Sequence, residues 1–335
     1  MKKALKTLSK LIGALLSAAI LALAVLLVLP LTENIHAAPK AGAADWMKDL
    51  PDDLSLSAVT LPGTHNSGTK NADLGFVMKC QGTDIATQLQ SGYRYLDIRL
   101  RVAENGEDLA FCHDFALCRS HWLPWSEALT ATDVLRDCYQ FLTAHPTETI
   151  LFAVKQDHGD EPTAEFQTVL ASILRENRDL WCLSEEVPTV GEARGKLVLL
   201  RRYEDAAGLG ADAGIALSWR DQGGSEDPTA ALGPDTDRIG SRPLFVQDRY
   251  GYDRAEKWTA FEKAFSEKQL PEGGTRIAFL STKGHFVFGH PYFFARDLNE
   301  KLLDRLNGPE KTEGWILLDF ADPALAEAIY RQNFR

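Results

Sequence analysis

The chain has 335 residues, a formal net charge of −11 and a sequence pI of about 5.3. This acidic balance argues against a nucleic-acid partner, because phosphate backbones attract clustered Lys and Arg side chains, and it gives little long-range attraction to anionic lipid. The length suits one large α/β barrel or two ordinary domains. Because the sequence has no Pro/Ser/Gly linker, low-complexity tract or internal repeat, we expect one domain and a monomer.

The N-terminal segment is typical of an export signal. Four lysines in the first ten residues precede an apolar run over residues 11–31, and small residues follow at positions 37 and 38. This pattern predicts a signal peptide over residues 1–37, ahead of a secreted domain over residues 45–335. Because the run reaches the roughly 20 residues that span a bilayer, an uncleaved anchor with the body facing outside stays open. Cleavage would remove four lysines and one glutamate and change the net charge to −14.

Strand and helix signals alternate after residue 50. We expect a first strand over residues 54–60, ended by Pro62 and Gly63. Further strands are predicted over residues 93–102, 109–113, 149–154, 195–200, 215–219, 244–247, 276–280 and 315–318. Helical apolar spacing predicts helices over residues 85–90, 132–142, 163–175, 255–268, 294–306 and 324–332. The alternation favours a parallel sheet, so we predict an α/β fold that is a single distorted (β/α)8 barrel of TIM type.

Polar side chains stand at the ends of the predicted strands. They are His65, Arg99, His113, Lys155, Arg202, Asp248 and Asp319. In barrel enzymes the carboxyl ends of the strands carry the catalytic residues. We therefore expect these side chains to lie together on one rim. Asp97 should lie beside Arg99, because residues two apart on a strand share a face.

Two histidines, an arginine and a carboxylate suit phosphoryl chemistry. One histidine can take a proton from an attacking hydroxyl while the other protonates the leaving oxygen, since both titrate near neutral pH. Arg99 can hold two phosphate oxygens in a bidentate fork. Asp319 follows an apolar strand, so we expect a buried carboxylate that orients His65. A polyhydroxylated ring would suit the remaining polar residues, which are Lys155, Arg202, Asp248 and Tyr250.

From about residue 46 to the last helix, the chain closely resembles the bacterial phosphatidylinositol-specific phospholipases C. The resemblance is carried by LPGTHNSGT (61–69), LDIR (96–99), Cys112-His113, PTETI (146–150), ARGKLVLLRRY (193–203), VQDRY (246–250) and GWILLD (314–319). That family has a distorted barrel and cleaves phosphatidylinositol to diacylglycerol and inositol 1,2-cyclic phosphate. The resemblance therefore implies a metal-independent lyase with no cofactor, acting on a phosphatidylinositol-containing membrane surface. Activity on glycosyl-phosphatidylinositol anchors stays open.

The resemblance also implies a role for each site residue. His65 is the expected general base on the inositol 2-hydroxyl, with Asp319 as its partner. Arg99 is expected to activate the phosphate and His113 to protonate the diacylglycerol oxygen. Asp97 matches a further active-site carboxylate. The inositol-binding positions are matched by Lys155, Arg202, Asp248 and Tyr250.

One position departs from the family pattern. Most bacterial members have Asp after the base histidine, where this chain has Asn66. An amide accepts a hydrogen bond without carrying charge, so it would raise the pKa of His113 less than a carboxylate does. We expect that Asp114 or Asp97 could compensate, and a slower enzyme is the alternative.

Two other functions stay open because of Asn66. It is similar to the residue after the histidine in calcium-dependent relatives, which suggests a metal-dependent phosphodiesterase with His65, Asn66 and Asp97 as ligands. Those relatives have carboxylates where this chain has Arg99 and Lys155, and Ca²⁺ needs about 6–8 oxygen ligands, so metal independence is favoured. The third hypothesis is an inositol-lipid binding protein whose weakened acid has lost turnover.

An aromatic stretch over residues 284–294 follows a predicted strand end. We expect Phe286 and Phe288 to contact the membrane, since apolar side chains would supply the interfacial binding that an acidic protein lacks. Phe294, Trp122 and Trp125 are expected to pack within the protein.

The chain has five cysteines, all after the export signal: Cys80, Cys112, Cys118, Cys138 and Cys182. The count is odd and no CxxC pair occurs, so the sequence gives only a weak disulfide framework. A bridge between Cys112 and Cys118, and mostly buried free thiols, are the two alternatives.

Overall fold

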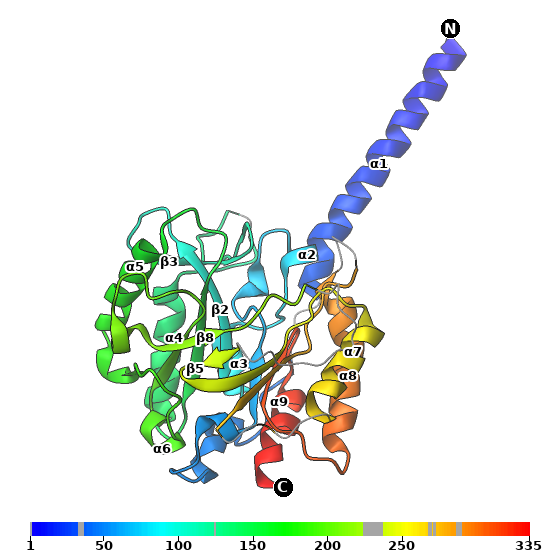
Figure 1. Cartoon of the computed structure of the whole chain (residues 1–335). Coiled ribbons are helices and arrows are strands. Elements are labelled where there is room, and N and C mark those ends of the chain that lie inside the picture. The colour runs from blue at the N-terminus through cyan, green and yellow to red at the C-terminus, as the bar shows by residue number, and fades with distance from the viewer. Residues whose placement is uncertain are drawn as a thin grey trace.

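The computed structural model describes residues 2–32, 37–123, 125–223, 237–266, 270, 273–285 and 290–335. Figure 1 shows a barrel flanked by helices, with α1 (Lys2–Thr32) projecting from the end at which α2 (Gly75–Met78) and β3 (Leu109–His113) lie. The strands of the barrel begin at residue 61.

Among the described residues, nine strands close a ring. Their order is β1 (Leu61–Thr64), β12 (Trp315–Leu318), β11 (Thr275–Phe279), β10 (Arg242–Gln247), β9 (Arg238–Ile239), β8 (Ile215–Ser218), β7 (Leu197–Arg201), β5 (Ile150–Gln156) and β2 (Tyr95–Val102), and β2 pairs with β1 to close it. Eight of these strands run parallel, and β9 pairs antiparallel with both β8 and β10. The predicted α/β barrel is confirmed, and β9 is one source of its distortion.

The remaining strands lie outside the ring. β3 pairs antiparallel with β2, β4 (Ala116–Leu117) pairs antiparallel with β3, and β6 (Trp181–Cys182) pairs with β7. The helices of the described chain are α3 (Ile85–Gln90), α4 (Ala131–Ala144), α5 (Thr163–Arg175), α6 (Val190–Ala193), α7 (Arg254–Ser266), α8 (Pro291–Asn307) and α9 (Pro323–Tyr330), besides α1 and α2. Between β7 and β8 the chain forms only a short 3-10 helix, Gly210–Ala213, which is a second irregularity.

Helix ends follow capping chemistry. The Asp84 side chain accepts from the Thr87 amide at the start of α3, and Thr130 accepts from the Asp133 amide at the start of α4. Such caps satisfy amides that have no partner inside the helix. α4 therefore begins at Ala131, one residue before the predicted helix over residues 132–142, whereas α3 and α5 begin and end where the sequence places them.

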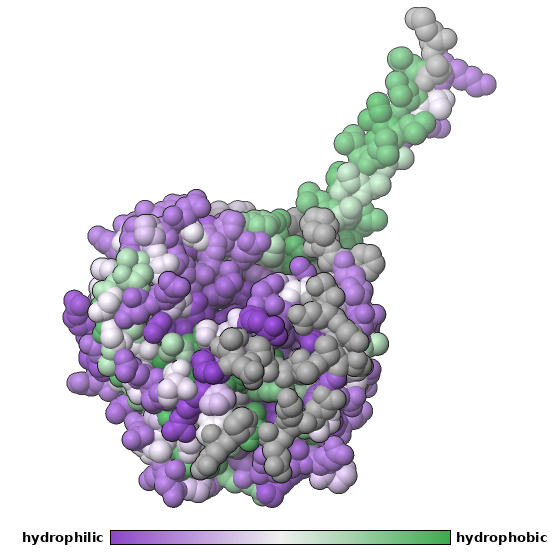
Figure 2. Space-filling view, viewed as in Figure 1, coloured by the Kyte–Doolittle hydropathy of each residue, from purple (hydrophilic) through white to green (hydrophobic). Residues whose placement is uncertain are grey.

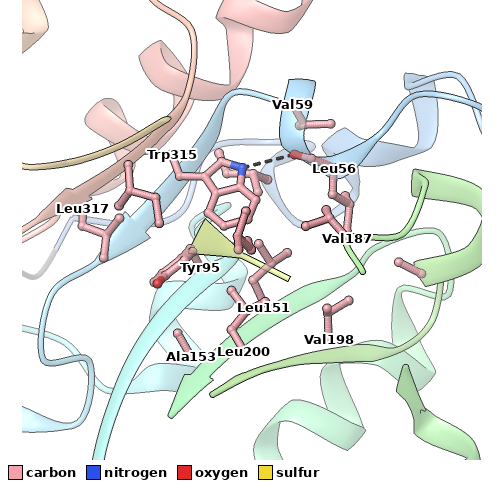
Figure 3. Close-up of a cluster of buried hydrophobic side chains, with 14 of the residues drawn as sticks. Leu56, Val59, Tyr95, Leu151, Ala153, Val187, Val198, Leu200, Trp315 and Leu317 are labelled. Atoms are coloured by element: carbon pink, nitrogen blue, oxygen red, sulfur yellow. Dashed lines mark hydrogen bonds between the residues drawn. The ribbon is translucent and has the colours of Figure 1, made fainter. Parts of the chain in front are cut away.

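The barrel interior is an apolar core that includes the fully buried Trp315. Figure 3 shows its indole among Tyr95, Leu151, Leu200 and other buried side chains, with Nε1 donating to the Leu56 carbonyl (3.1 Å). Burying a large side chain of this kind contributes about 1.5–3 kcal/mol. The core thus fixes the strands whose carboxyl ends carry the polar residues.

The prediction of a first strand over residues 54–60 is wrong. Residues 54–60 do not form a strand; instead Ser55 caps a 3-10 helix, Leu56–Ala58, and β1 begins at Leu61. Pro62 lies one residue before the pairing of β1 with β2 begins at Gly63, so its missing N–H interrupts no pair there. A Cβ on Gly63 would lie 2.9 Å from Cβ of Tyr95, which explains why glycine stands inside this strand.

The N-terminal helix is the most apolar surface of the molecule. Residues Leu5–Val25 of α1 are long and apolar enough to span a membrane, and none of that stretch is buried in the protein. Figure 2 shows this helix as hydrophobic against a mainly hydrophilic body. A signal sequence and a membrane anchor both have this character, so both alternatives remain.

All five cysteines are free thiols, and all but the partly buried Cys182 are buried. The alternative of a Cys112–Cys118 bridge is therefore wrong. Trp122 and Trp125 are 64% and 77% exposed, so the expectation that they pack within the protein is wrong too. Phe286 and Phe288 lie outside the described residues.

Candidate active site

β1 places His65 at the rim of the barrel, where hydrogen bonds hold its backbone in position. The His65 amide donates to the Leu318 carbonyl (2.9 Å), and the Gln81 side chain donates to the carbonyls of His65 (2.7 Å) and Leu318 (2.8 Å). The His65 Nδ1 lies 2.7 Å from Oδ1 of Asp319, which is buried directly after β12. Because a carboxylate only accepts, Nδ1 carries the proton and Nε2 keeps a lone pair.

Arg99 on β2 faces that lone pair. Its NH2 lies 3.0 Å from His65 Nε2 and 3.4 Å from Asp97 Oδ2, and its NH1 lies 3.7 Å from Asp157 Oδ2. Burial alone would raise the pKa of Asp97, but Arg99 and Arg202 outweigh burial and hold that pKa well below its usual range. The Arg99 Nε is buried with no hydrogen-bond partner among the described residues. Arg99 is therefore a fixed cation that has an N–H donor available for a ligand.

His113 reaches the site by a route that the sequence did not predict. β3 runs antiparallel to β2, so this histidine comes from a hairpin and not from the carboxyl end of a parallel barrel strand. Its ring centroid lies 6.4 Å from that of His65, and its Nδ1 donates to the Met78 carbonyl (2.7 Å). Burial, with the nearby Arg99 cation adding to it, lowers the pKa of His113 to about 4.

Asn66 turns the chain away from β1 with a left-handed backbone conformation (φ 46°). Its side-chain Nδ2 lies 3.4 Å from His65 Nε2 and 3.9 Å from Cys80 Sγ. Its Oδ1 is buried and has no hydrogen-bond partner within the described chain. An unsatisfied buried acceptor is costly, so this oxygen marks a position where a ligand could bind.

The described carboxylate that acts on the pKa of His113 is Asp157, and burial, Arg99 and the Met78 carbonyl each affect that pKa more. Asp114 pairs with His158 (3.0 Å). Asp97 accepts from the backbone amide of Asn66 (3.1 Å) and from the arginines described above. The expectation that one of these two carboxylates compensates for Asn66 is therefore wrong, and a backbone carbonyl takes their place.

Two of the expected ring-binding residues, Arg202 and Asp248, contact Trp219, which directly follows β8. The Arg202 guanidinium lies 3.8 Å from the Trp219 ring centroid, and the Trp219 Nε1 donates to Asp248 Oδ2 (3.1 Å). Arg202 also lies 3.4 Å from Asp97. The indole thus fixes a cation after β7 and a carboxylate after β10 next to one another.

Tyr250 and Lys155 are partly exposed at the same rim. The Tyr250 hydroxyl donates to Asp221 (2.9 Å), and burial together with that carboxylate raises the Tyr250 pKa to about 12. The Lys155 ammonium pairs with Asp157 (2.7 Å). Asp157 also faces Arg99, so one carboxylate links the two cations.

The sequence did not predict three residues as part of this site: Trp219, Asp157 and Cys80. The first two follow β8 and β5, so a stricter search of strand ends would have found them. Cys80 lies in the loop after α2, where no pattern in the sequence distinguishes it. It comes to the site only through the tertiary fold.

The residues present do not fit a calcium ion at His65, Asn66 and Asp97. The Arg99 NH2 lies between two of these ligands, 3.0 Å from His65 and 3.4 Å from Asp97. A guanidinium there repels a divalent cation, and a histidine and an amide supply too few hard oxygens. Asp97, the carboxylate that would have to bind calcium, is already neutralised by Arg99 and Arg202.

An acid–base pair of histidines beside a fixed cation, at the carboxyl edge of an α/β barrel, is typical of barrel enzymes that act on phosphate esters. Comparison with known proteins narrows this class. A model described as phosphatidylinositol-specific phospholipase C, X domain, matches residues 60–203. Residues 60–203 are therefore similar to the X domain of the phosphatidylinositol-specific phospholipases C.

Individual relatives agree with this similarity. The chain is 28% identical over 294 residues to 1-phosphatidylinositol phosphodiesterase of Staphylococcus aureus (strain Newman), covering 83% of this chain and 88% of that protein. It is 31% identical over 206 residues to PI-PLC X domain-containing protein 1 of Mus musculus, covering 51% and 56%. A mutant phosphatidylinositol-specific phospholipase C of Staphylococcus aureus matches the fold with a TM-score of 0.69 at 23% identity, covering 86% of this chain and 98% of that one.

Proposed function

We propose that this chain is a phospholipase C that cleaves phosphatidylinositol to diacylglycerol and inositol 1,2-cyclic phosphate. One observation carries the proposal: His65 Nδ1 lies 2.7 Å from Asp319 while His65 Nε2 lies 3.0 Å from Arg99. This arrangement presents a basic nitrogen directly beside a cation that can bind phosphate. The similarity to this family supports the class of substrate.

The first half of the reaction forms a bond between the inositol 2-oxygen and phosphorus. The His65 Nε2 accepts the proton of that hydroxyl, and Asp319 stabilises the imidazolium through the Nδ1 hydrogen bond. Arg99 turns from His65 to the phosphate and uses its spare donors on the non-bridging oxygens, where negative charge develops.

The second half breaks the bond between phosphorus and the diacylglycerol oxygen, which takes a proton from His113. With a pKa of about 4, His113 is neutral in the unliganded protein near pH 7. A bound phosphate offsets the charge of Arg99, one cause of that low pKa, and so raises the pKa of His113. We propose that the substrate itself makes His113 a competent acid.

Inositol recognition is assigned to Lys155, Arg202, Asp248 and Tyr250. The contacts of Arg202 and Asp248 with Trp219 support this assignment, because they hold a donor and an acceptor in place before a ligand arrives. A site that is fixed in advance loses less conformational entropy on binding.

Hydrolysis of phosphatidylinositol vesicles with and without EDTA tests the function. Turnover should be unchanged by the chelator, because Arg99 supplies the positive charge at the phosphate. Loss of turnover on chelation, restored by Ca²⁺, would favour the metal-dependent phosphodiesterase. Binding of inositol lipid without any hydrolysis would favour the non-catalytic binding protein.

We propose Phe286 and Phe288 as the membrane contact of this enzyme. The support is the acidic body, which needs apolar side chains at the interface, each buried Phe contributing about 1.5–3 kcal/mol. Replacing both by Ala should weaken vesicle binding and vesicle hydrolysis and leave hydrolysis of soluble inositol cyclic phosphate nearly unchanged. Trp122→Ala/Trp125→Ala is the matched comparison, since these exposed tryptophans test whether any surface aromatic has the same effect.

Export of the domain over residues 45–335, with residues 1–37 as a signal peptide or anchor, is part of the same proposal. The apolar exposed helix α1 supports it. Mass spectrometry of the mature protein would show whether the chain begins at residue 38. Release of an anchored protein from cell membranes would test activity on glycosyl-phosphatidylinositol anchors.

A further inference from the structure

Cys80 lies against the proposed catalytic base and has no part in the reaction described above. Its side chain is buried, with Sγ 3.9 Å from His113 Nδ1 and 3.9 Å from Asn66 Nδ2. One ligand atom each of His65, Cys80 and Asp319 lies within 4.8 Å of the other two. An imidazole nitrogen, a thiol and a carboxylate are the ligand types that zinc takes in proteins.

A second observation points to a ligand at the same place. The Asn66 side chain is 1% exposed, and its Oδ1 has no hydrogen-bond partner in the described part of the chain. The other atom of this amide, Nδ2, already lies beside His65 and Cys80. The three protein ligands leave a fourth zinc position for water, as in other zinc sites with three protein ligands.

We propose that the catalytic centre described above also contains an inhibitory site for Zn²⁺ and related borderline-soft cations. This site is formed by His65, Cys80 and Asp319. The inhibition rests on the proposed function, because the ion takes the base and its carboxylate partner out of the reaction. The mixed nitrogen, sulfur and oxygen ligands select Zn²⁺ over Ca²⁺ and Mg²⁺, which prefer oxygen alone.

The geometry requires a small closure of the cluster. Zinc bonds of about 2.0–2.3 Å place neighbouring ligand atoms roughly 3.3–3.5 Å apart. The thiol must therefore approach by up to about 1.3 Å, while His65 Nδ1 and Asp319 Oδ1, now 2.7 Å apart, must separate by about 0.6 Å. Rotation of the Cys80 side chain can provide this movement.

Proton balance follows from the ligand atoms. Zinc binds the Cys80 sulfur as a thiolate and releases one proton to solvent. Zinc also takes Nδ1 of His65, so the ring proton moves through water to Nε2, and Arg99 must withdraw from that nitrogen.

The test measures Zn²⁺ inhibition of vesicle hydrolysis for the parent chain, Cys80→Ser, Cys80→Ala and the control Cys182→Ser. Cys182 is a partly exposed thiol on β6, so its variant corrects for unspecific zinc binding. We expect either Cys80 variant to raise the half-inhibiting Zn²⁺ concentration roughly tenfold or more, and Cys182→Ser to leave it unchanged. Each variant is compared with its own metal-free rate, and thermal unfolding confirms that it is folded.

Cobalt binding gives a readout that does not need turnover. Co²⁺ added to the parent chain should produce a thiolate-to-cobalt absorption band that both Cys80 variants lack. Cys80 variants as sensitive to Zn²⁺ as the parent, or a parent without the cobalt band, would overturn the proposal. If the chain hydrolysed no lipid yet kept the Cys80-dependent band, the metal site would stand and the proposed function would fail.

Discussion

Two arginines close together on the same segment of chain differ in how fully their donors are used. Arg94, just before β2, is completely buried at the amino end of the barrel, and all its N–H groups donate: to Glu148 and to the carbonyls of Leu89, Tyr93, Ala43 and Ala44. Arg99, within β2, contacts His65 and Asp97 and keeps an unpartnered Nε. Both lie beside carboxylates, yet only Arg94 is fully buried and has every donor in use.

The difference separates a structural ion pair from a reactive one. Arg94 ties residues 43–47 to the barrel, since its partner Glu148 also accepts from the Met47 amide (3.0 Å). No donor of Arg94 remains for a ligand. Around Arg99, a donor of the guanidinium and the Oδ1 of Asn66 have no partner among the residues that the structure describes. Natural proteins tolerate such buried groups mainly where a ligand completes the network.

The largest effect on turnover is expected from replacing His65, because the contact with His65 distinguishes Arg99 from Arg94. His65→Ala should lower turnover on phosphatidylinositol by roughly 10²–10⁴-fold, the range typical of general acid–base groups, and His113→Ala should do the same. Thermal unfolding of both variants should stay close to that of the parent. Near-normal turnover in either variant would refute the two-histidine mechanism.

The two arginines can be compared by the same substitution. Arg99→Lys should lower turnover about 100-fold, because a point charge cannot reproduce the bidentate fork, and it should leave the fold stable. Arg94→Lys should lower the free energy of unfolding by about 3 kcal/mol and leave the turnover of the folded fraction unchanged. Denaturant unfolding and vesicle assays on both variants measure these outcomes. If both variants lost stability and turnover alike, the distinction between the two arginines would be lost.

The free energy of unfolding should also depend on pH, through the protonation of His113 at the rim. The folded-state pKa of His113 is about 4, below the ordinary unfolded value near 6.5, so the unfolded chain binds this proton first as pH falls. His113 therefore stabilises the folded state above pH about 6.5, and this contribution is lost as pH falls toward about 4. Since the side chain is partly exposed, we expect about 1–2 kcal/mol. Urea unfolding of the parent and His113→Gln over this interval gives the contribution as a difference, and parallel curves would contradict it.

The smallest effect is expected at Trp219. Trp219→Phe keeps an aromatic face for Arg202 and removes the Nε1 donor to Asp248, a hydrogen bond of about 1 kcal/mol. KM for phosphatidylinositol should rise several-fold while kcat changes little, because the reacting groups are untouched. Trp219→Leu, which removes the face as well, should raise KM further. A fall in kcat alone would show that Trp219 does not act through the ring-binding residues.

The sequence predicted what depends on short-range pattern. The bounds of α3, α5 and β12 follow from apolar periodicity and caps, and Asp97 and Arg99 share a face because strand residues alternate. The start of β1 was missed because Pro62 and Gly63 normally end strands, whereas here Gly63 allows close packing against Tyr95. Such close approach depends on the tertiary fold, which local sequence does not report.

The site was predicted less completely for a similar reason. Strand ends identify residues such as Arg99 and Asp319, but the Met78 carbonyl and Cys80 reach His113 from the end of α2 and the loop after it. The antiparallel course of β3 also depends on pairing with β2, so the direction from which His113 enters could not be read from its own segment.

The contact between β1 and β12 has a consequence for how the protein folds. His65 and Asp319 are separated by 254 positions along the chain, and they meet only where the first and last barrel strands pair. Contacts of such high sequence separation form late, because the loop-closure entropy must be overcome first. The His65–Asp319 contact therefore cannot form in any intermediate with an open barrel. A refolding chain should acquire its hydrolytic competence only in the kinetic phase that closes the ring.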